Sequence, residues 1–145
     1  MQHRRTEFYH GFSVSVALGL LYFVLPSIAA AQHQEVIQGG EIEYQQHCAV
    51  CHGSDGRGGG AMAVDLAVKP ADLTQVASRN GGVFPFWRIY RTIDGREFVR
   101  GHGTREMPVW GRRFQEESRE AGPLQETLVK GRVLGLVFYL QSIQR

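Results

Sequence analysis

Hydrophobic positions recur at helical spacing in three stretches of the chain. The stretch 124–144 has the clearest period, and one side of the predicted helix is apolar: Leu128, Val129, Val133, Leu136, Val137, Leu140 and Ile143. The stretch 85–92 predicts a second helix, which begins with Pro85 and has Gly95 beyond its end. Its apolar stripe, expected in the core, consists of Phe86, Ile89, Tyr90 and Ile93.

A third helix is predicted over 35–52, where four residues on one side follow at intervals of four: Val36, Gly40, Tyr44 and Cys48. Glycines inside this helix and at positions 131 and 135 of the last one predict a close contact between the two helices. Two strand-like runs compete with the helical reading, but neither alternates apolar and polar residues. We therefore expect a predominantly α-helical protein.

The segments between the predicted helices are rich in glycine and proline. Residues 53–60 contain five glycines, so they form a loop, which we expect to pass close to a bound group. Pro70 predicts an extended turn, and residues 101–111 are expected to be a loop. Residues 112–120 are polar and predict a helical excursion on the surface.

Residues 1–31 have the features of a signal peptide. Arg4 and Arg5 precede an uncharged apolar stretch over 11–25, and three alanines before Gln32 offer a cleavage site. We favour the general secretory route over the twin-arginine route. The alternative is an uncleaved membrane anchor formed by residues 11–31. In either case the chain is exported, and 32–145 form the mature domain.

The length of 145 residues suits one domain, and a formal net charge of +2 argues against a nucleic-acid-binding protein. The charge is unevenly distributed, because residues 79–113 carry eight arginines and three acidic residues. Residues 32–75 carry two basic and six acidic residues. A candidate docking patch for an acidic partner consists of Arg88, Arg91, Arg105, Arg112 and Arg113.

The two cysteines of the chain lie in the motif Cys48-Ala49-Val50-Cys51-His52. On a helix, Cys48, Cys51 and His52 occupy positions i, i+3 and i+4 and share one face. Cys-x-x-Cys-His is the attachment motif of a c-type haem, in which two thioethers hold the porphyrin and the histidine binds iron. We therefore expect one covalently attached haem with His52 as an axial ligand.

Three other roles compete with haem attachment for these cysteines. A redox dithiol expects a neighbouring βαβ pattern, which the glycine-rich stretch does not supply. A zinc site using His47 and His52 would need residues between adjacent ligands so that a tetrahedron can close. A structural disulfide is the third alternative.

Met107 is the candidate sixth ligand of the iron. Pro108 holds it in an extended conformation within a loop, and its thioether is a soft ligand that raises the reduction potential. His102 and Met62 are the alternatives, of which His102 is favoured over Met62.

These motifs resemble those of class I cytochromes c, of the small bacterial periplasmic kind. The matching segments are Gly40-x-x-x-Tyr44-x-x-x-Cys48-Ala49-x-Cys51-His52-Gly53, Gly56-x-Gly58, 70–74, 107–111 and 136–142. The resemblance implies the cytochrome c fold, with three to five helices around one haem and with crossing first and last helices. It further implies that the Pro70 carbonyl accepts a hydrogen bond from His52. Further candidate cofactor contacts are Arg57, Trp87 and Trp110.

The function expected from this reading is one-electron transfer in the periplasm between respiratory or dehydrogenase partners, by a protein that is a monomer and not an enzyme. Two alternatives keep an open position on the iron: a peroxidase-like haem enzyme and a haem-based gas sensor. Membrane association is expected only through partners or an uncleaved leader.

Overall fold

The computed structural model describes residues 30–96 and 107–145. These residues form helices and loops without a β-strand, which confirms the all-α class. The contacts discussed below belong to one compact unit, Val36–Arg145. Among the described residues, no helix has both the length and the apolar character needed to cross a membrane. The predicted leader lies outside the described residues, except for positions 30 and 31.

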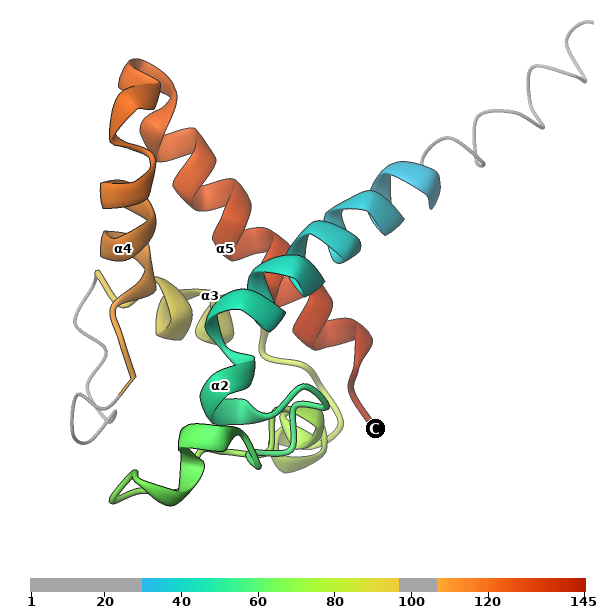
Figure 1. Cartoon of the computed structure of the whole chain (residues 1–145). Helices are drawn as coiled ribbons and strands as arrows, with labels where there is room; N and C mark the ends of the chain where they lie inside the picture. The colour runs from blue at the N-terminus through green and yellow to red at the C-terminus, as the bar shows by residue number, and fades with distance from the viewer. Residues whose placement is uncertain (1–29, 97–106) are drawn as a thin grey trace, which may run out of the picture. The chain divides into compact units, whose positions relative to one another are not determined.

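The first of the described helices covers residues 30–47 and is called the N-terminal helix (Figure 1). Those that follow are α2 (Ala49–His52), the 3-10 helices η1 (Ala61–Val64), η2 (Leu73–Gln75) and η3 (Ser78–Asn80), α3 (Phe86–Asp94), α4 (Trp110–Glu117), the 3-10 helix η4 (Arg119–Leu124) and α5 (Gln125–Ser142). The predicted helix over 35–52 is thus divided by a turn at Cys48.

The N-terminal helix and α5 cross, as Figure 1 shows, and Gly40 and Gly135 lie against each other at the crossing. A Cβ on Gly40 would lie only 1.9 Å from the carbonyl oxygen of Gly135, so the two backbones touch directly. One turn further, the buried ring of Tyr44 packs on Tyr139 with their centroids 5.1 Å apart. This confirms the expected crossing. Gly131, also expected at the contact, has no atom within 4 Å of its Cβ position.

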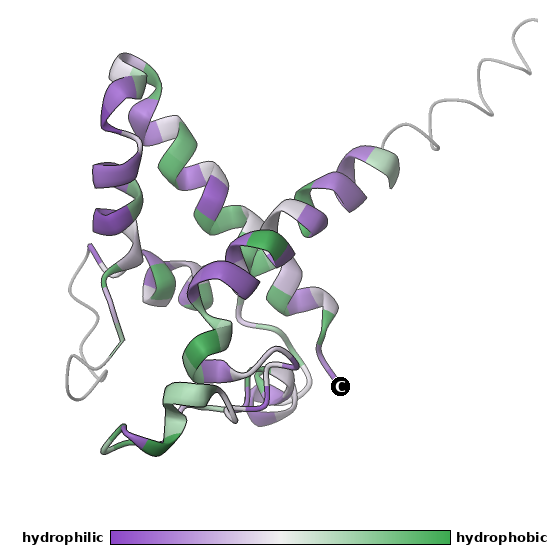
Figure 2. Cartoon of the chain, viewed as in Figure 1, coloured by the Kyte–Doolittle hydropathy of each residue, from purple (hydrophilic) through white to green (hydrophobic). Residues whose placement is uncertain are grey.

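Helix α5 contributes six of the ten buried hydrophobic residues in the described part of the chain. Five of its predicted apolar residues are buried: Val129, Val133, Leu136, Val137 and Leu140. Figure 2 shows hydrophobic residues recurring along this helix between polar ones. Leu128 is about half exposed, because it lies about 100° around the helix axis from Val129.

Helix α3 follows its sequence signals closely. Pro85 precedes its first residue, and Gly95 ends it in the left-handed conformation with φ of 63°. Of the predicted core stripe, Ile93 is buried, and the other three residues are partly buried against the core. The stripe therefore faces the core as predicted.

Helix α4 differs from its prediction in two respects. It begins at Trp110, within the segment 101–111 that was expected to be a loop. Position 111 accommodates only glycine without a shift of its neighbours, because a Cβ there would meet the Asp94 carboxylate oxygen at 2.1 Å. The prediction of a surface excursion over 112–120 is also wrong in part, since Phe114 is buried and packs on Trp110.

Gly40→Ala is expected to destabilise the folded protein, because its methyl group would overlap the Gly135 carbonyl and separate the helices. Overpacking of this kind costs about 1–3 kcal/mol. Gly39→Ala is the matched control, because no atom lies within 4 Å of its Cβ position, and it should be neutral or stabilising by up to ~1 kcal/mol. Thermal unfolding measures both variants, and equal midpoints would contradict the role given to this crossing.

Candidate functional site

Cys48, Cys51 and His52 lie on a single turn of helix. The Cys48 carbonyl accepts hydrogen bonds from the amides of Cys51, at 3.1 Å, and His52, at 2.9 Å. Helix α2 then ends at Gly53, whose φ of 80° is in the left-handed region that favours glycine. The three side chains therefore have the predicted i, i+3, i+4 arrangement.

The glycine-rich loop folds back onto α2. The amide of Gly58 donates to the His52 carbonyl at 2.7 Å, and that of Gly60 donates to the Cys51 carbonyl at 3.1 Å. A Cβ at Gly60 would lie 2.4 Å from the Val50 carbonyl oxygen. The close approach that the sequence predicted is therefore made to the backbone of the chain itself.

The imidazole of His52 is oriented by a backbone carbonyl, but not by the expected one. Its Nδ1 lies 3.1 Å from the carbonyl oxygen of Ala71. The Pro70 carbonyl instead faces the glycine-rich loop, where a Cβ on Gly58 would lie 2.2 Å from its oxygen. The prediction is thus corrected by one residue. With Nδ1 donating to Ala71, Nε2 is left to bind a metal.

Burial affects the two reactive groups of the motif in ways that suit a haem site. Burial lowers the pKa of His52, which favours the neutral imidazole that metals require. Burial, with Glu43 and Cys51 adding to it, raises the pKa of the Cys48 thiol to about 12. A redox dithiol depends on a low thiol pKa, so this environment argues against that alternative.

A cavity of about 340 Å³ lies beside Cys48 and His52. Its apolar lining consists of Leu73, Val76, Ile89, Ile93, Leu136 and Leu140. These residues come from α3, α5 and the segment after Ala71, so elements distant in the sequence build one pocket. The volume is in the range of cofactor pockets.

Met107 lines the same cavity as His52. Its side chain is 40% exposed, and it lies three residues before the buried Trp110. The alternative ligand Met62 is in η1 and is not among the lining residues, while His102 lies outside the described residues. An apolar pocket that contains an imidazole, a thioether and an attachment cysteine fits a haem.

Two arginines at the cavity were not predicted as cofactor contacts. Arg79 and Arg88 both line it, and the Arg88 guanidinium donates to the Asn80 side chain at 3.1 Å. Their positive charge suits the carboxylate groups of a haem. The sequence signal that could have indicated Arg88 is its position beside Ile89, at the edge of the predicted apolar stripe of α3. Arg79 follows no such periodicity, because it lies in a short 3-10 turn.

Three other candidate contacts do not line this cavity. Trp87 is 63% exposed and packs edge-on against Phe86. Trp110 is buried instead against His47, with centroids 5.3 Å apart. Arg57 is exposed in the glycine-rich loop.

His47 precedes the cysteines but belongs to another cluster. Its Nε2 lies 3.4 Å from the Glu43 carboxylate, and its ring packs on Trp110 and Phe114. In the part of the chain that the structure describes, no group of three or more His, Cys, Asp or Glu side chains could hold a metal ion. The arrangement therefore does not favour the zinc alternative. Both cysteines are free thiols in the structure.

The structure describes four of the five arginines of the predicted docking patch. Arg88, Arg91, Arg112 and Arg113 are exposed on α3 and α4, and Arg113 stacks over the Trp110 ring at 5.3 Å. Arg105 lies outside the described residues.

Comparison with known families gives one match. Residues 35–121 match the family model described as cytochrome C oxidase, cbb3-type, subunit III. This range is well over half of the 145 residues, and it includes both the cysteine motif and Met107. No curated protein and no solved structure gives a significant match.

Gly58→Ala is expected to weaken the bond between His52 and a haem iron. The alanine would be strained at φ of 83° and would collide with the Pro70 carbonyl, displacing the Ala71 acceptor beside it. A weaker ligand is protonated off the iron more easily, so the acid transition of the haem spectrum should move to higher pH. A loss of about 1 kcal/mol corresponds to about 0.7 pH unit.

Gly59→Ala is the control for this titration, because nothing lies within 4 Å of its Cβ position. An acid transition at the same pH in both variants would show that the Gly58 contact does not orient His52.

Proposed function

The chain belongs to the cytochrome c oxidase, cbb3-type, subunit III family of cytochrome c domains, and on this premise we propose that it is a periplasmic one-electron carrier with a single haem c. Membership of a cytochrome c family implies electron transfer by haem. The finer proposal assigns His52 and Met107 as the axial ligands. In this proposal the protein transfers electrons between partners and converts no substrate.

The observation that carries this proposal is that His52 and Met107 line one cavity. When bound, a haem supplies a one-electron couple between ferrous and ferric iron. Cys48 and Cys51 would hold it by adding their thiols across its two vinyl groups, which requires no further reactant. Ala71 keeps the His52 ring oriented, and the Met107 thioether favours the ferrous state.

The other lining residues support the same role. The aliphatic side chains of the lining would surround a bound haem with apolar groups, and a low dielectric favours the less charged ferrous centre. Arg79 and Arg88 are placed to pair with carboxylates at the cavity. With His52 and Met107 both bound to the iron of a haem, no position would remain for a substrate.

We further propose that the partners are redox proteins, with an oxidase complex as the first candidate, because the matched family is described as an oxidase subunit. Arg91, Arg112 and Arg113, which are exposed on α3 and α4 and do not line the cavity, would meet an acidic surface on such a partner. The predicted leader supports a periplasmic location. A dehydrogenase as electron donor uses the same chemistry and differs only in the partner.

Met107→Ala is expected to abolish the methionine-to-iron charge-transfer band in the optical spectrum of the ferric protein. Met62→Ala is the matched control, since Met62 has a similar exposure of 46% but does not line the cavity, and it should keep the band. A band that survives Met107→Ala would exclude Met107 as the ligand.

A wild-type protein without this band would favour the alternatives. His102 would then be tested as the ligand, followed by peroxide turnover and the binding of small ligands to an open site.

The intact mass of the exported, matured protein should equal that of residues 32–145 plus one haem. The chain has two cysteines, enough for one attachment motif, and addition to vinyl groups releases no atoms. Mass spectrometry under denaturing conditions checks both parts. Loss of the haem on denaturation would contradict covalent attachment, and a mass that retains residues 1–31 would indicate an uncleaved anchor.

A further inference from the structure

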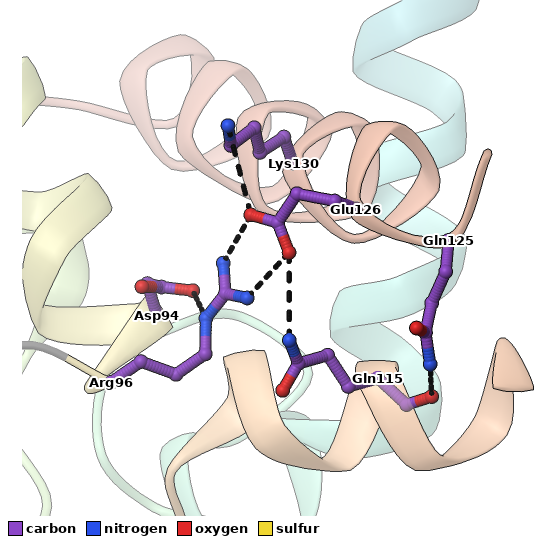
Figure 3. A network of polar contacts seen from close by, with 6 residues as sticks. All are labelled: Asp94, Arg96, Gln115, Gln125, Glu126 and Lys130. Carbon is purple, nitrogen blue, oxygen red and sulfur yellow. Dashed lines mark hydrogen bonds and ion pairs between the residues drawn. The ribbon is translucent and has the colours of Figure 1, made fainter. Parts of the chain in front are cut away.

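Arg96 lies at the end of α3, directly before the undescribed residues 97–106, and its guanidinium binds two carboxylates. Its Nη1 and Nη2 lie 2.7 and 3.0 Å from the two oxygens of Glu126, and its Nε lies 2.8 Å from Asp94. Figure 3 shows the side chain held between α3 and α5 in this way. Since Asp94 is buried and the Arg96 side chain is only 22% exposed, their ion pair is partly shielded from solvent, whereas the Glu126 side chain is 46% exposed.

The backbone that carries Met107 packs on this network. A Cβ on Gly111 would lie 2.1 Å from the Asp94 carboxylate and 2.7 Å from Arg96 Nε, so α4 begins in direct contact with both groups. A Cβ on Gly95 would lie 3.4 Å from the Cα of Val109. Residues before the undescribed segment therefore touch residues that follow Met107.

Glu126 is itself fixed by its neighbours, as Figure 3 shows. The side-chain amide of Gln115 in α4 lies 3.5 Å from its carboxylate, and Lys130 lies 3.6 Å away on the next turn of α5. Gln125 donates to the Gln115 carbonyl at 2.7 Å. The network thus joins α3, α4 and α5: Asp94 and Arg96 contact the start of α4 at Gly111, and Glu126 contacts its second half at Gln115.

We propose that Arg96 and Glu126 are positioning residues for Met107: their ion pair holds the start of α4 against α3 and α5, and thereby keeps the thioether at the cavity. This inference rests on the proposed function, in which Met107 is the sixth ligand. Val109 and Gly111 lie only two and four residues after Met107, and Pro108 stiffens the backbone between them. Displacement of α4 is therefore transmitted to the ligand.

The alternative is that the network only ties helices together, and a second network offers the comparison. Arg132 in α5 binds Glu43 at 2.7 and 2.9 Å and Glu117 at 2.7 Å. The Glu117 and Glu126 side chains are 45% and 46% exposed, and their arginine partners are 23% and 22% exposed. Glu117 is at the far end of α4 from Met107, so it is a matched control.

The experiment compares Glu126→Gln with Glu117→Gln in the full, haem-loaded ferric protein titrated with imidazole. Imidazole binds the iron only in molecules from which Met107 has dissociated, so its apparent affinity reports the population of that state. We expect Glu126→Gln to raise the affinity about five-fold, which is roughly 1 kcal/mol at 1.4 kcal/mol per tenfold. Glu117→Gln should leave it within about two-fold, although both variants lose an ion pair between an arginine and a glutamate of similar exposure.

Arg96→Lys provides a second variant, which keeps the charge but loses the two-pronged contact with Glu126. Its imidazole affinity should lie between those of the wild-type protein and Glu126→Gln. Thermal unfolding of all the variants accompanies the titration, because a purely structural tie would lower the midpoint without changing imidazole affinity.

Unchanged imidazole affinity in Glu126→Gln, or an equal increase in Glu117→Gln, would overturn the positioning role. If the wild-type protein has the methionine-to-iron band, either of these titration results overturns the positioning role alone and leaves Met107 as the ligand. If the band is absent there, the ligand assignment of the proposed function fails, and the positioning role fails with it.

Discussion

The contact between Gly40 and Gly135 is the constraint on which the rest of the structure depends. Because no side chain separates the two backbones, the N-terminal helix and α5 cross at a fixed point and angle. Tyr44 then packs on Tyr139, and its hydroxyl donates to the Gly53 carbonyl at 2.7 Å. The crossing is in this way connected to the end of α2, where the cysteine motif stops.

The same crossing builds one wall of the cavity. Tyr44 from the first helix and Leu136 and Leu140 from α5 line it together, and Cys48 follows Tyr44 by one helical turn. The lining also includes residues of α3 and Met107, which do not contact the two glycines of the crossing. The ion pairs of Arg96 with Asp94 and Glu126 connect the end of α3 to α5, so helix packing and ion pairs each stabilise one part of the pocket.

The sequence predicted the parts of this molecule that depend on local rules. Cys48, Cys51 and His52 follow from helical spacing, and the ends of α3 follow from Pro85 and Gly95. Features that depend on tertiary contacts were missed. Gly111 indicated a loop by composition, but it lies in α4, and the glycine is needed there because Asp94 leaves no room for a side chain.

Other differences have the same origin. Phe114 is buried among polar neighbours because Trp110, His47 and the Arg132 guanidinium surround it, and no local pattern reports such a site. The shift of the His52 acceptor from Pro70 to Ala71 is a difference of one peptide, set by the contact of Pro70 with Gly58. The ligand assignment itself remains a prediction.

The N-terminal helix contacts residues of α5 that are far from it in the sequence, and this affects whether haem attachment comes before or after folding. Arg132 and Glu43, for example, are 89 positions apart in the sequence. Contacts of such separation form late, since the intervening chain must first be brought together. Cys48 is partly buried against the core to which α5 contributes, so it is more accessible before α5 has packed there. We therefore expect covalent modification of the motif to precede folding, so that the finished fold encloses a cofactor already in place.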